Sequence, residues 1–252
     1  MEYISKEEKK LDIKDPNGKW SDITLLPEWE EEFYDVYTAR KHGKWVMLKA
    51  LKKQYANDPA CRNMLDREFE TRYNLSHANI VMVNDYEEVP GIGFAIITDD
   101  VYGFSLRRLI DEKRLSPLIL HRLQTQLLDA MAYIQENHIV HYPISPENII
   151  FTEYNQNLKL INVGYDQKDS LSKQDTQEDI KAWGTVVNEV LDNLPTKLPR
   201  LRRIAQHARE GKYDNVPDVA LDVERRSSSQ LYIFICLFIV IMLVVLGFLL
   251  TR

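Results

Sequence analysis

Hydrophobic and polar positions follow a strand-like pattern from residue 20 to about residue 98, interrupted by one helical stretch. Four stretches carry the strand pattern: 33–39, 44–51, 80–89 and 93–98. The first pair flanks Lys41-His42-Gly43, which is typical of a hairpin turn, and the second pair flanks Pro90-Gly91. The pattern therefore predicts a small β-rich unit in the N-terminal part of the chain.

Apolar residues recur at helical spacing in two longer stretches. In the stretch 59–75 they are Met64, Leu65, Phe69 and Tyr73. In the stretch 118–137 they are Leu120, Leu123, Leu127, Met131 and Ile134. Ser116 and Pro117 precede the second stretch as an N-cap and a first-turn residue. The order of elements predicts an α+β fold, with a β-rich lobe over residues 20–98 and a mainly helical lobe over residues 99–223.

The end of the chain has a different pattern, because residues 231–250 contain no charged side chain over twenty positions. As a helix they would span roughly 30 Å, the thickness of the hydrocarbon core of a bilayer. A buried core helix is the alternative, but such helices rarely lack a polar face over this length. We predict a single C-terminal transmembrane helix after a polar linker at 224–230. Arg225 and Arg226 before it, against Arg252 after it, predict a cytoplasmic main domain.

Composition narrows the class of protein. Of the 252 residues, 44% are hydrophobic and 10% aromatic, which is too many for a disordered chain. The 32 basic and 38 acidic residues give a net charge of −6, which argues against a nucleic-acid partner because phosphates are bound by Lys and Arg. Two cysteines exclude a disulfide scaffold and a Cys-based zinc site. The charged N-terminal tip, residues 1–19, is expected to be frayed.

Four short sequences occur in an order that points to one chemistry: VMLK at 46–49, REFE at 67–70, HYPISPEN at 141–148 and NVG at 162–164. In this order they resemble the strand lysine, helix glutamate, catalytic loop and metal-binding loop of the protein kinase family. The resemblance covers roughly residues 20–223. It implies a two-lobed, protein-kinase-like fold with a small β-rich N-lobe and a trimmed helical C-lobe.

The resemblance implies roles for three retained residues. Lys49 and Glu68 correspond to the family's ion pair, in which the lysine holds the phosphates of ATP. A structural salt bridge between strand and helix is the alternative, and we favour it because the phosphate-covering loop is altered. Asn148 corresponds to the family's second metal ligand.

Three other positions of the two loops depart from the family pattern. Pro143 stands where the family has the aspartate that accepts the proton of the substrate hydroxyl, and proline offers no base. Ser145 replaces a lysine that steadies the transferred phosphoryl group. Asn162 replaces the metal-binding aspartate, and Mg²⁺ prefers a carboxylate to a neutral amide. We therefore predict no catalytic residue and no metal site.

The glycines of the phosphate-covering loop are also absent. An alignment on Val36 places Trp29, Glu31 and Tyr34 at the three glycine positions. Glycine allows backbone N–H groups to approach the phosphates closely. Two bulky rings would block that approach and a glutamate would repel a phosphate. A solvated strand edge is the ordinary alternative for the acidic residues here.

Three more polar residues have open interpretations. Asp179 either braces the catalytic loop, as the resemblance implies, or is a first-turn acid of a helix capped by Thr176. His141 is more typical of a packed, hydrogen-bonded histidine than of a catalytic one. Asp166 is the nearby carboxylate that could move to a metal ion if the acids were relocated.

Together these features predict a membrane-anchored pseudokinase, a binding, scaffolding or regulatory module on the cytoplasmic face without phosphoryl transfer. We expect no cofactor, although the cleft could hold ATP without binding Mg²⁺ efficiently. An atypical ATP-binding protein kinase with relocated acids and a non-catalytic, nucleotide-responsive switch are the alternatives. The expected partners are the lipid bilayer, through residues 231–250, and an unidentified protein at the membrane; a nucleic-acid partner is not expected.

Overall fold

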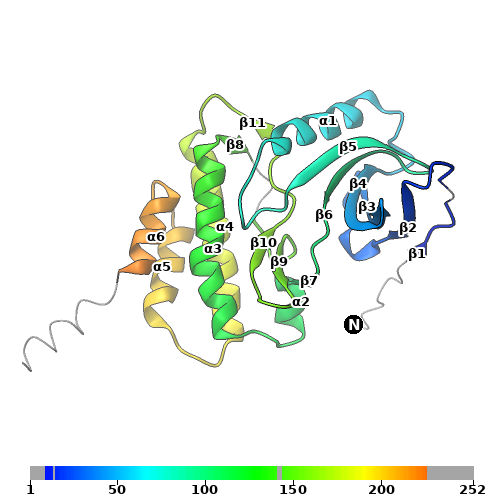
Figure 1. Ribbon diagram of the computed structural model, residues 1–252. Coiled ribbons are helices and arrows are strands. Elements are labelled where there is room, and N and C mark those ends of the chain that lie inside the picture. The colour runs from blue at the N-terminus through cyan, green and yellow to red at the C-terminus, as the bar shows by residue number, and fades with distance from the viewer. Residues whose placement is uncertain (1–8, 14, 141–143, 226–252) are drawn as a thin grey trace, which may run out of the picture.

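The computed structural model describes residues 9–13, 15–140 and 144–225. These residues form two lobes, a β-sheet lobe with one helix and a mainly helical lobe (Figure 1). The first lobe consists of β1 (Lys9–Lys10), β2 (Trp20–Leu25), β3 (Tyr34–Lys41), β4 (Lys44–Leu51), α1 (Pro59–Tyr73), β5 (Val83–Val89) and β6 (Gly93–Asp99). A short 3-10 turn, Pro27–Trp29, lies between β2 and β3. The α+β prediction is confirmed in this part of the chain.

The second lobe begins with short strands and ends in helices. It consists of β7 (Gly103–Ser105), α2 (Leu106–Asp111), α3 (Pro117–Glu136), β8 (Ile139–Val140), β9 (Ile149–Thr152), β10 (Leu158–Leu160), β11 (Asp166–Gln167), α4 (Lys173–Asn193), α5 (Pro199–Arg209) and α6 (Val216–Glu224). Helix α5 packs against α4, and α6 packs against α3. The core between them is apolar, and Trp183 at its centre donates from Nε1 to the carbonyl oxygen of Leu123 at 3.0 Å.

The sheet of the first lobe has the strand order β1-β2-β3-β4-β6-β5, with neighbouring strands antiparallel. The predicted hairpin between β3 and β4 is confirmed. Its two turn residues, His42 and Gly43, have φ values of 50° and 81°. Positive φ at both positions is the requirement of the tight turn that matches the twist of two strands.

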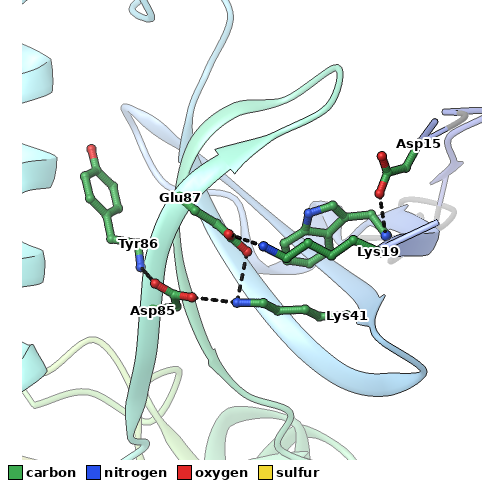
Figure 2. A network of polar contacts seen from close by, with 7 residues as sticks. Asp15, Lys19, Lys41, Asp85, Tyr86 and Glu87 are labelled. Carbon is green, nitrogen blue, oxygen red and sulfur yellow. Dashed lines mark hydrogen bonds and ion pairs between the residues drawn. The ribbon is translucent and has the colours of Figure 1, made fainter. Parts of the chain in front are cut away.

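A polar network joins β5, at one end of the sheet order, to Lys41 of β3 and to Lys19, which precedes β2 (Figure 2). Lys19 and Lys41 reach toward Asp85 and Glu87 of β5, which is the strand at the far end of the sheet order. The Nζ atom of Lys41 lies 2.7 Å from Oδ2 of Asp85 and 2.9 Å from Oε1 of Glu87, and Lys19 pairs with the other oxygen of Glu87. Both ammonium groups also lie over the ring of Trp20, at 5.9 and 5.7 Å from its centroid.

Two helix starts test the capping signals considered in the sequence. Ser116 caps α3 as predicted, and its Oγ accepts from the backbone N–H of Ile119. Of the two open interpretations of Asp179, a first-turn acid after a Thr176 cap does not fit the structure. Helix α4 begins at Lys173, because Ser172 and Asp175 form a reciprocal capping box one turn earlier. Asp179 therefore lies in the second turn of α4.

Two further expectations concern the N-terminal tip and the predicted transmembrane segment. Lys9–Lys10, inside the tip that was expected to be frayed, pair with β2, and the N–H of Leu11 donates to the carbonyl oxygen of Ile23 at 2.8 Å. Of the residues that the structure describes, none forms a helix long and apolar enough to cross a membrane. The predicted transmembrane segment, 231–250, lies outside the described residues, and α6 ends at Glu224.

Candidate functional site

Lys49 and Glu68 form a buried ion pair at the interface of the sheet and α1. Lys49 lies in β4 between Val36 of β3 and Ile96 of β6, and its side chain is 7% exposed. Its Nζ atom lies 3.0 Å from Oε2 of Glu68, whose side chain is fully buried on α1. The resemblance to the kinase family implied this ion pair, and the structure forms it.

A second cation shares the same carboxylate. Nη1 of Arg72, one helical turn after Glu68, lies 2.7 Å from Oε1 of Glu68, and the Arg72 side chain is 4% exposed. Burial alone would raise the pKa of the Glu68 carboxyl, but the charges of Lys49 and Arg72 outweigh burial and hold this pKa below its ordinary value. Arg72 was not among the predicted site residues, although the spacing of four residues on a predicted helix is a signal for such a pair.

Glu31 joins the network from the segment before β3. Its Oε2 lies 3.0 Å from Nζ of Lys49, and its Oε1 accepts a hydrogen bond of 2.8 Å from Nδ2 of Asn162. Glu31 comes from the β-rich lobe and Asn162 follows β10 of the helical lobe, so this carboxylate bridges the two lobes. The sequence predicted that Glu31 would repel a phosphate, but it did not predict that its carboxylate would bind the retained lysine.

The two aromatic residues of the same segment lie on either side of Glu31. The ring centroid of Tyr34 is 4.4 Å from Nζ of Lys49, and this side chain is almost completely buried. Burial, together with the charges of Glu68 and Glu31, raises the pKa of the Tyr34 hydroxyl. Tyr34 thus packs beneath the lysine as a cation–π partner.

Trp29 packs against a small apolar cluster whose residues come from both lobes. The cluster consists of Val81, Ile150 and Ile161, with Val101 beside it. Trp29 is half-buried there, and Ile161 directly precedes Asn162 in the chain. The indole of Trp29 and the carboxylate of Glu31 therefore contact neighbouring residues, Ile161 and Asn162, of one segment of the helical lobe.

The segment that carries Asn162 is fixed by its backbone. Asn162 has a φ of 54°, a left-handed conformation that Asn tolerates better than most residues. Gly164 has a φ of 78°, and a Cβ atom there would come within 2.9 Å of Thr71 on α1. The N–H of Ile161 donates to the carbonyl oxygen of Asn148 at 3.0 Å, which places the two asparagine segments side by side.

The remaining predicted site residues either make local contacts of their own or lie outside the described residues. The carbonyl oxygen of Ser145 accepts from the N–H of Asn148 at 3.1 Å. Asp166 pairs with Val140 between β11 and β8, and its side chain accepts from the N–H of Gln167. His141 and Pro143 lie outside the described residues.

The donor set does not fit Mg²⁺ or a nucleotide phosphate in this conformation. Both oxygens of Glu31 are engaged, one with Lys49 and one with Asn162. In the described ranges there is no group of three or more His, Cys, Asp or Glu side chains that could hold a metal ion. In the described part of the chain, the only carboxylate hydrogen-bonded to Asn162 is that of Glu31, which also binds Lys49.

Comparison with known proteins decides the family. Residues 32–192, more than half of the chain, match the family model described as "Protein kinase domain". The chain belongs to the protein kinase family. Its β-rich and helical lobes are therefore the two lobes of a protein kinase fold.

Individual relatives of this kinase-family chain agree. Serine/threonine-protein kinase PknD of Mycobacterium tuberculosis is 32% identical over 124 residues, which is 48% of this chain and 18% of PknD. Serine/threonine-protein kinase PrkC of Bacillus subtilis is 32% identical over 120 residues, 47% of this chain and 18% of PrkC. The crystal structure of the PknI kinase domain from M. tuberculosis matches with a TM-score of 0.61 and 18% identity, covering 83% of this chain and 98% of that domain. The chain spans less than a fifth of the length of PknD and PrkC.

These relatives overturn one expectation. The prediction of a binding or scaffolding module without phosphoryl transfer is wrong, because the matching relatives are named serine/threonine-protein kinases. The prediction treated the substitutions Pro143, Ser145 and Asn162 as a loss of function.

Proposed function

We propose that this chain is a serine/threonine protein kinase that binds ATP between its lobes at Lys49 and transfers the terminal phosphoryl group slowly to a hydroxyl side chain. The observation that carries the proposal is the formed, buried pair between Lys49 and Glu68. Holding two charges in a low-dielectric interior is costly unless they are well paired, so a network retained at this family position favours a use for the lysine. The names of the relatives support the same activity.

The rate is expected to be low. Pro143 supplies no proton acceptor at the position of the family's catalytic aspartate, and Asn162 supplies an amide where the family has a carboxylate. The first change alone predicts a loss of about 10²- to 10⁴-fold relative to a kinase with a base in place. Long incubations and a high enzyme concentration are therefore needed for a fair test.

The test is transfer of radiolabelled phosphate from ATP by the full-length chain, solubilised in detergent, to itself and to a general protein substrate. Acid-stable label on serine or threonine is expected in the wild type and should be lost in Lys49→Met. Lys53→Met is the matched control, because Lys53 is an exposed lysine close to Lys49 in the sequence, and this variant should keep the wild-type rate. Label that is equal in wild type and Lys49→Met, or absent from both, would contradict the proposal.

The location of the domain is part of the same proposal. Residues 231–250 are proposed to anchor the chain in a membrane, with the kinase domain on the cytoplasmic side and a protein partner or substrate on the same surface. The support is the uncharged twenty-residue stretch and the two arginines, Arg225 and Arg226, that precede it. Full-length chain should stay with membranes after extraction at alkaline pH, whereas a chain ending at Ser229 should be released. Equal release of both would contradict the anchor.

A further inference from the structure

We propose that residues 27–31 act as an intramolecular competitor of the nucleotide, with Glu31 in place of a phosphate and Trp29 in place of the base. This inference rests on the proposed nucleotide cleft and concerns its regulation. The cleft would then exist in a closed form, which the structure shows, and an open form that accepts a nucleotide.

The charges of the network show why Glu31 and a phosphate exclude each other. Lys49 and Arg72 supply two positive charges, and Glu68 and Glu31 supply two negative ones. Glu68 is shared between both cations, so Glu31 completes the neutralisation of a buried lysine. If Glu31 withdraws, one positive charge is left uncompensated, and an anion such as a phosphate oxygen can take the position of the carboxylate. Two anions at that position would repel each other strongly, because the side chain of Lys49 is shielded from water.

The hydrogen bond to Asn162 adds a second point of competition. Glu31 accepts from Nδ2 of Asn162 at 2.8 Å, so the carboxylate covers both the lysine and the residue at the family's metal-binding position. A nucleotide phosphate that approached either group would meet the same obstacle.

In the proposed competitor, Trp29 takes the place of the aromatic base of the nucleotide. Its flat indole lies on an apolar cluster that includes Ile150 and Ile161, directly beside the segment of Asn162. A purine nucleotide likewise presents a flat ring and an adjacent anion. Both parts of the competitor lie within three consecutive residues, so one movement of the segment would clear both places.

The local contacts permit such a movement without breaking the sheet. The segment leaves β2 through a 3-10 turn in which the N–H of Trp29 donates to the carbonyl oxygen of Leu26 at 3.1 Å. It rejoins β3 where the N–H of Glu31 donates to the carbonyl oxygen of Tyr34 at 3.0 Å. The paired residues of β2 and β3 end at Leu25 and Tyr37 on this side, and the N–H of Leu26 makes one further backbone bond to Val36. Residues 27–31 lie outside this ladder, and the partly exposed ion pair of Glu30 with Lys52 at 2.8 Å is a further contact that the movement would break.

The experiment compares three probes on purified full-length chain: ATP, inorganic tripolyphosphate and adenosine, each by calorimetry with and without Mg²⁺. Glu31→Ala and the nearly isosteric Glu31→Gln should bind ATP and tripolyphosphate at least tenfold more tightly than the wild type, and adenosine more tightly by a smaller factor, because the same movement also frees the place of the base. Trp29→Ala should bind adenosine more tightly. Glu32→Ala is the matched control, because Glu32 is an adjacent, exposed acid, and it should leave all three affinities unchanged.

The outcomes separate this inference from the proposed function. Unchanged affinity for ATP and tripolyphosphate in both Glu31 variants would overturn the competition, even if the wild type transfers phosphate. Weaker binding of ATP in these variants with Mg²⁺ would also overturn it, because Glu31 would then serve the metal ion. Tighter binding of tripolyphosphate in both variants, lost again on adding Lys49→Met, would support the inference even if no variant transferred phosphate.

Discussion

Arg72 and Lys49 bind the same carboxylate: Oε1 of Glu68 lies 2.7 Å from Nη1 of Arg72, and Oε2 lies 3.0 Å from Nζ of Lys49. The two cations belong to α1 and β4, so Glu68 joins the helix to the sheet while its charge is divided between them. This division leaves part of the charge of Lys49 to be met by Glu31. The charge available at Lys49 therefore depends on Arg72 of α1 as well as on Glu31.

Arg72→Met should destabilise the fold. The variant leaves Glu31 and Glu68, two carboxylates, against Lys49 alone in a buried site, and loss of one partner of such a network costs about 3 to 5 kcal/mol. Chemical denaturation of the full chain at neutral pH measures the free energy of unfolding. Arg67→Met on the same helix is the control, because Arg67 is exposed, and it should change stability by less than about 0.5 kcal/mol. Equal effects of the two variants would show that the network does not stabilise the native state.

Gly184→Ala should be destabilising, although alanine normally favours a helix. A Cβ atom at Gly184 would lie 2.6 Å from the carbonyl oxygen of Ala205 and 2.9 Å from Cβ of Ala208, where α4 and α5 pack together. The overpacking should cost about 1 to 3 kcal/mol, more than the gain of about 0.5 to 1 kcal/mol in helix propensity. Thermal unfolding should show a lower Tm for Gly184→Ala and little change for Thr185→Ala, which is exposed on the next position. A raised Tm for Gly184→Ala would contradict the close packing of α4 against α5 at this position.

The capping box of α4 predicts a specific dependence of stability on acid pH. A hydrogen bond from Lys168 and further ones from Ser172 lower the pKa of Asp175 from 3.8 to about 2. The charged carboxylate is favoured in the folded chain, so its contribution to stability is complete above pH 3.8 and is lost as the pH falls toward 2. Asp175→Asn should therefore reduce stability at pH 5 to 7 and flatten the fall in unfolding free energy between pH 4 and 2. Parallel curves for variant and wild type would contradict this role.

The network that joins β5 to Lys41 and Lys19 should be stronger than an ordinary surface ion pair. Lys41 is largely shielded, contacts Asp85 and Glu87 together and lies over Trp20. We expect Lys41→Met to cost about 1 to 2 kcal/mol, because it removes two charged contacts at once from a partly buried site. Lys44→Met removes a single exposed pair with Asp99 and should cost less than about 1 kcal/mol. Equal losses of unfolding free energy in urea would show that the contacts of Lys41 stabilise the fold no more than an ordinary surface ion pair does.

The local features of the fold were predictable from the sequence. The hairpin at His42-Gly43 and the Ser116 cap depend on residues within a few positions of one another, and such signals are visible in a sequence. The Lys49–Glu68 pair was predictable for a different reason, since the motif order of a family fixes which distant residues meet. Periodicity alone was less reliable on α1, where Met64 and Tyr73 share the apolar pattern of Leu65 but are 43% and 52% exposed.

The contacts of Glu31 could not be predicted, because they depend on how one segment crosses between lobes. Glu31 and Asn162 are 131 positions apart, and no local pattern relates them. In the sequence Glu31 was one of three successive acids and was interpreted as a source of repulsion. Beside a lysine whose own partner is shared with Arg72, the same charge becomes an attractive contact.

The most direct test of the account is chemical labelling of Lys49 by an acyl-phosphate derivative of ATP, which acylates a lysine amine next to bound phosphates. Mass spectrometry of the full-length chain should find Lys49 labelled in the wild type, more strongly labelled in Glu31→Ala, and protected in both by excess ATP. Lys52 and Lys53 are internal controls and should be labelled weakly and without protection. Labelling of Lys49 that is no stronger than that of Lys53 and insensitive to ATP would contradict a nucleotide site at this lysine.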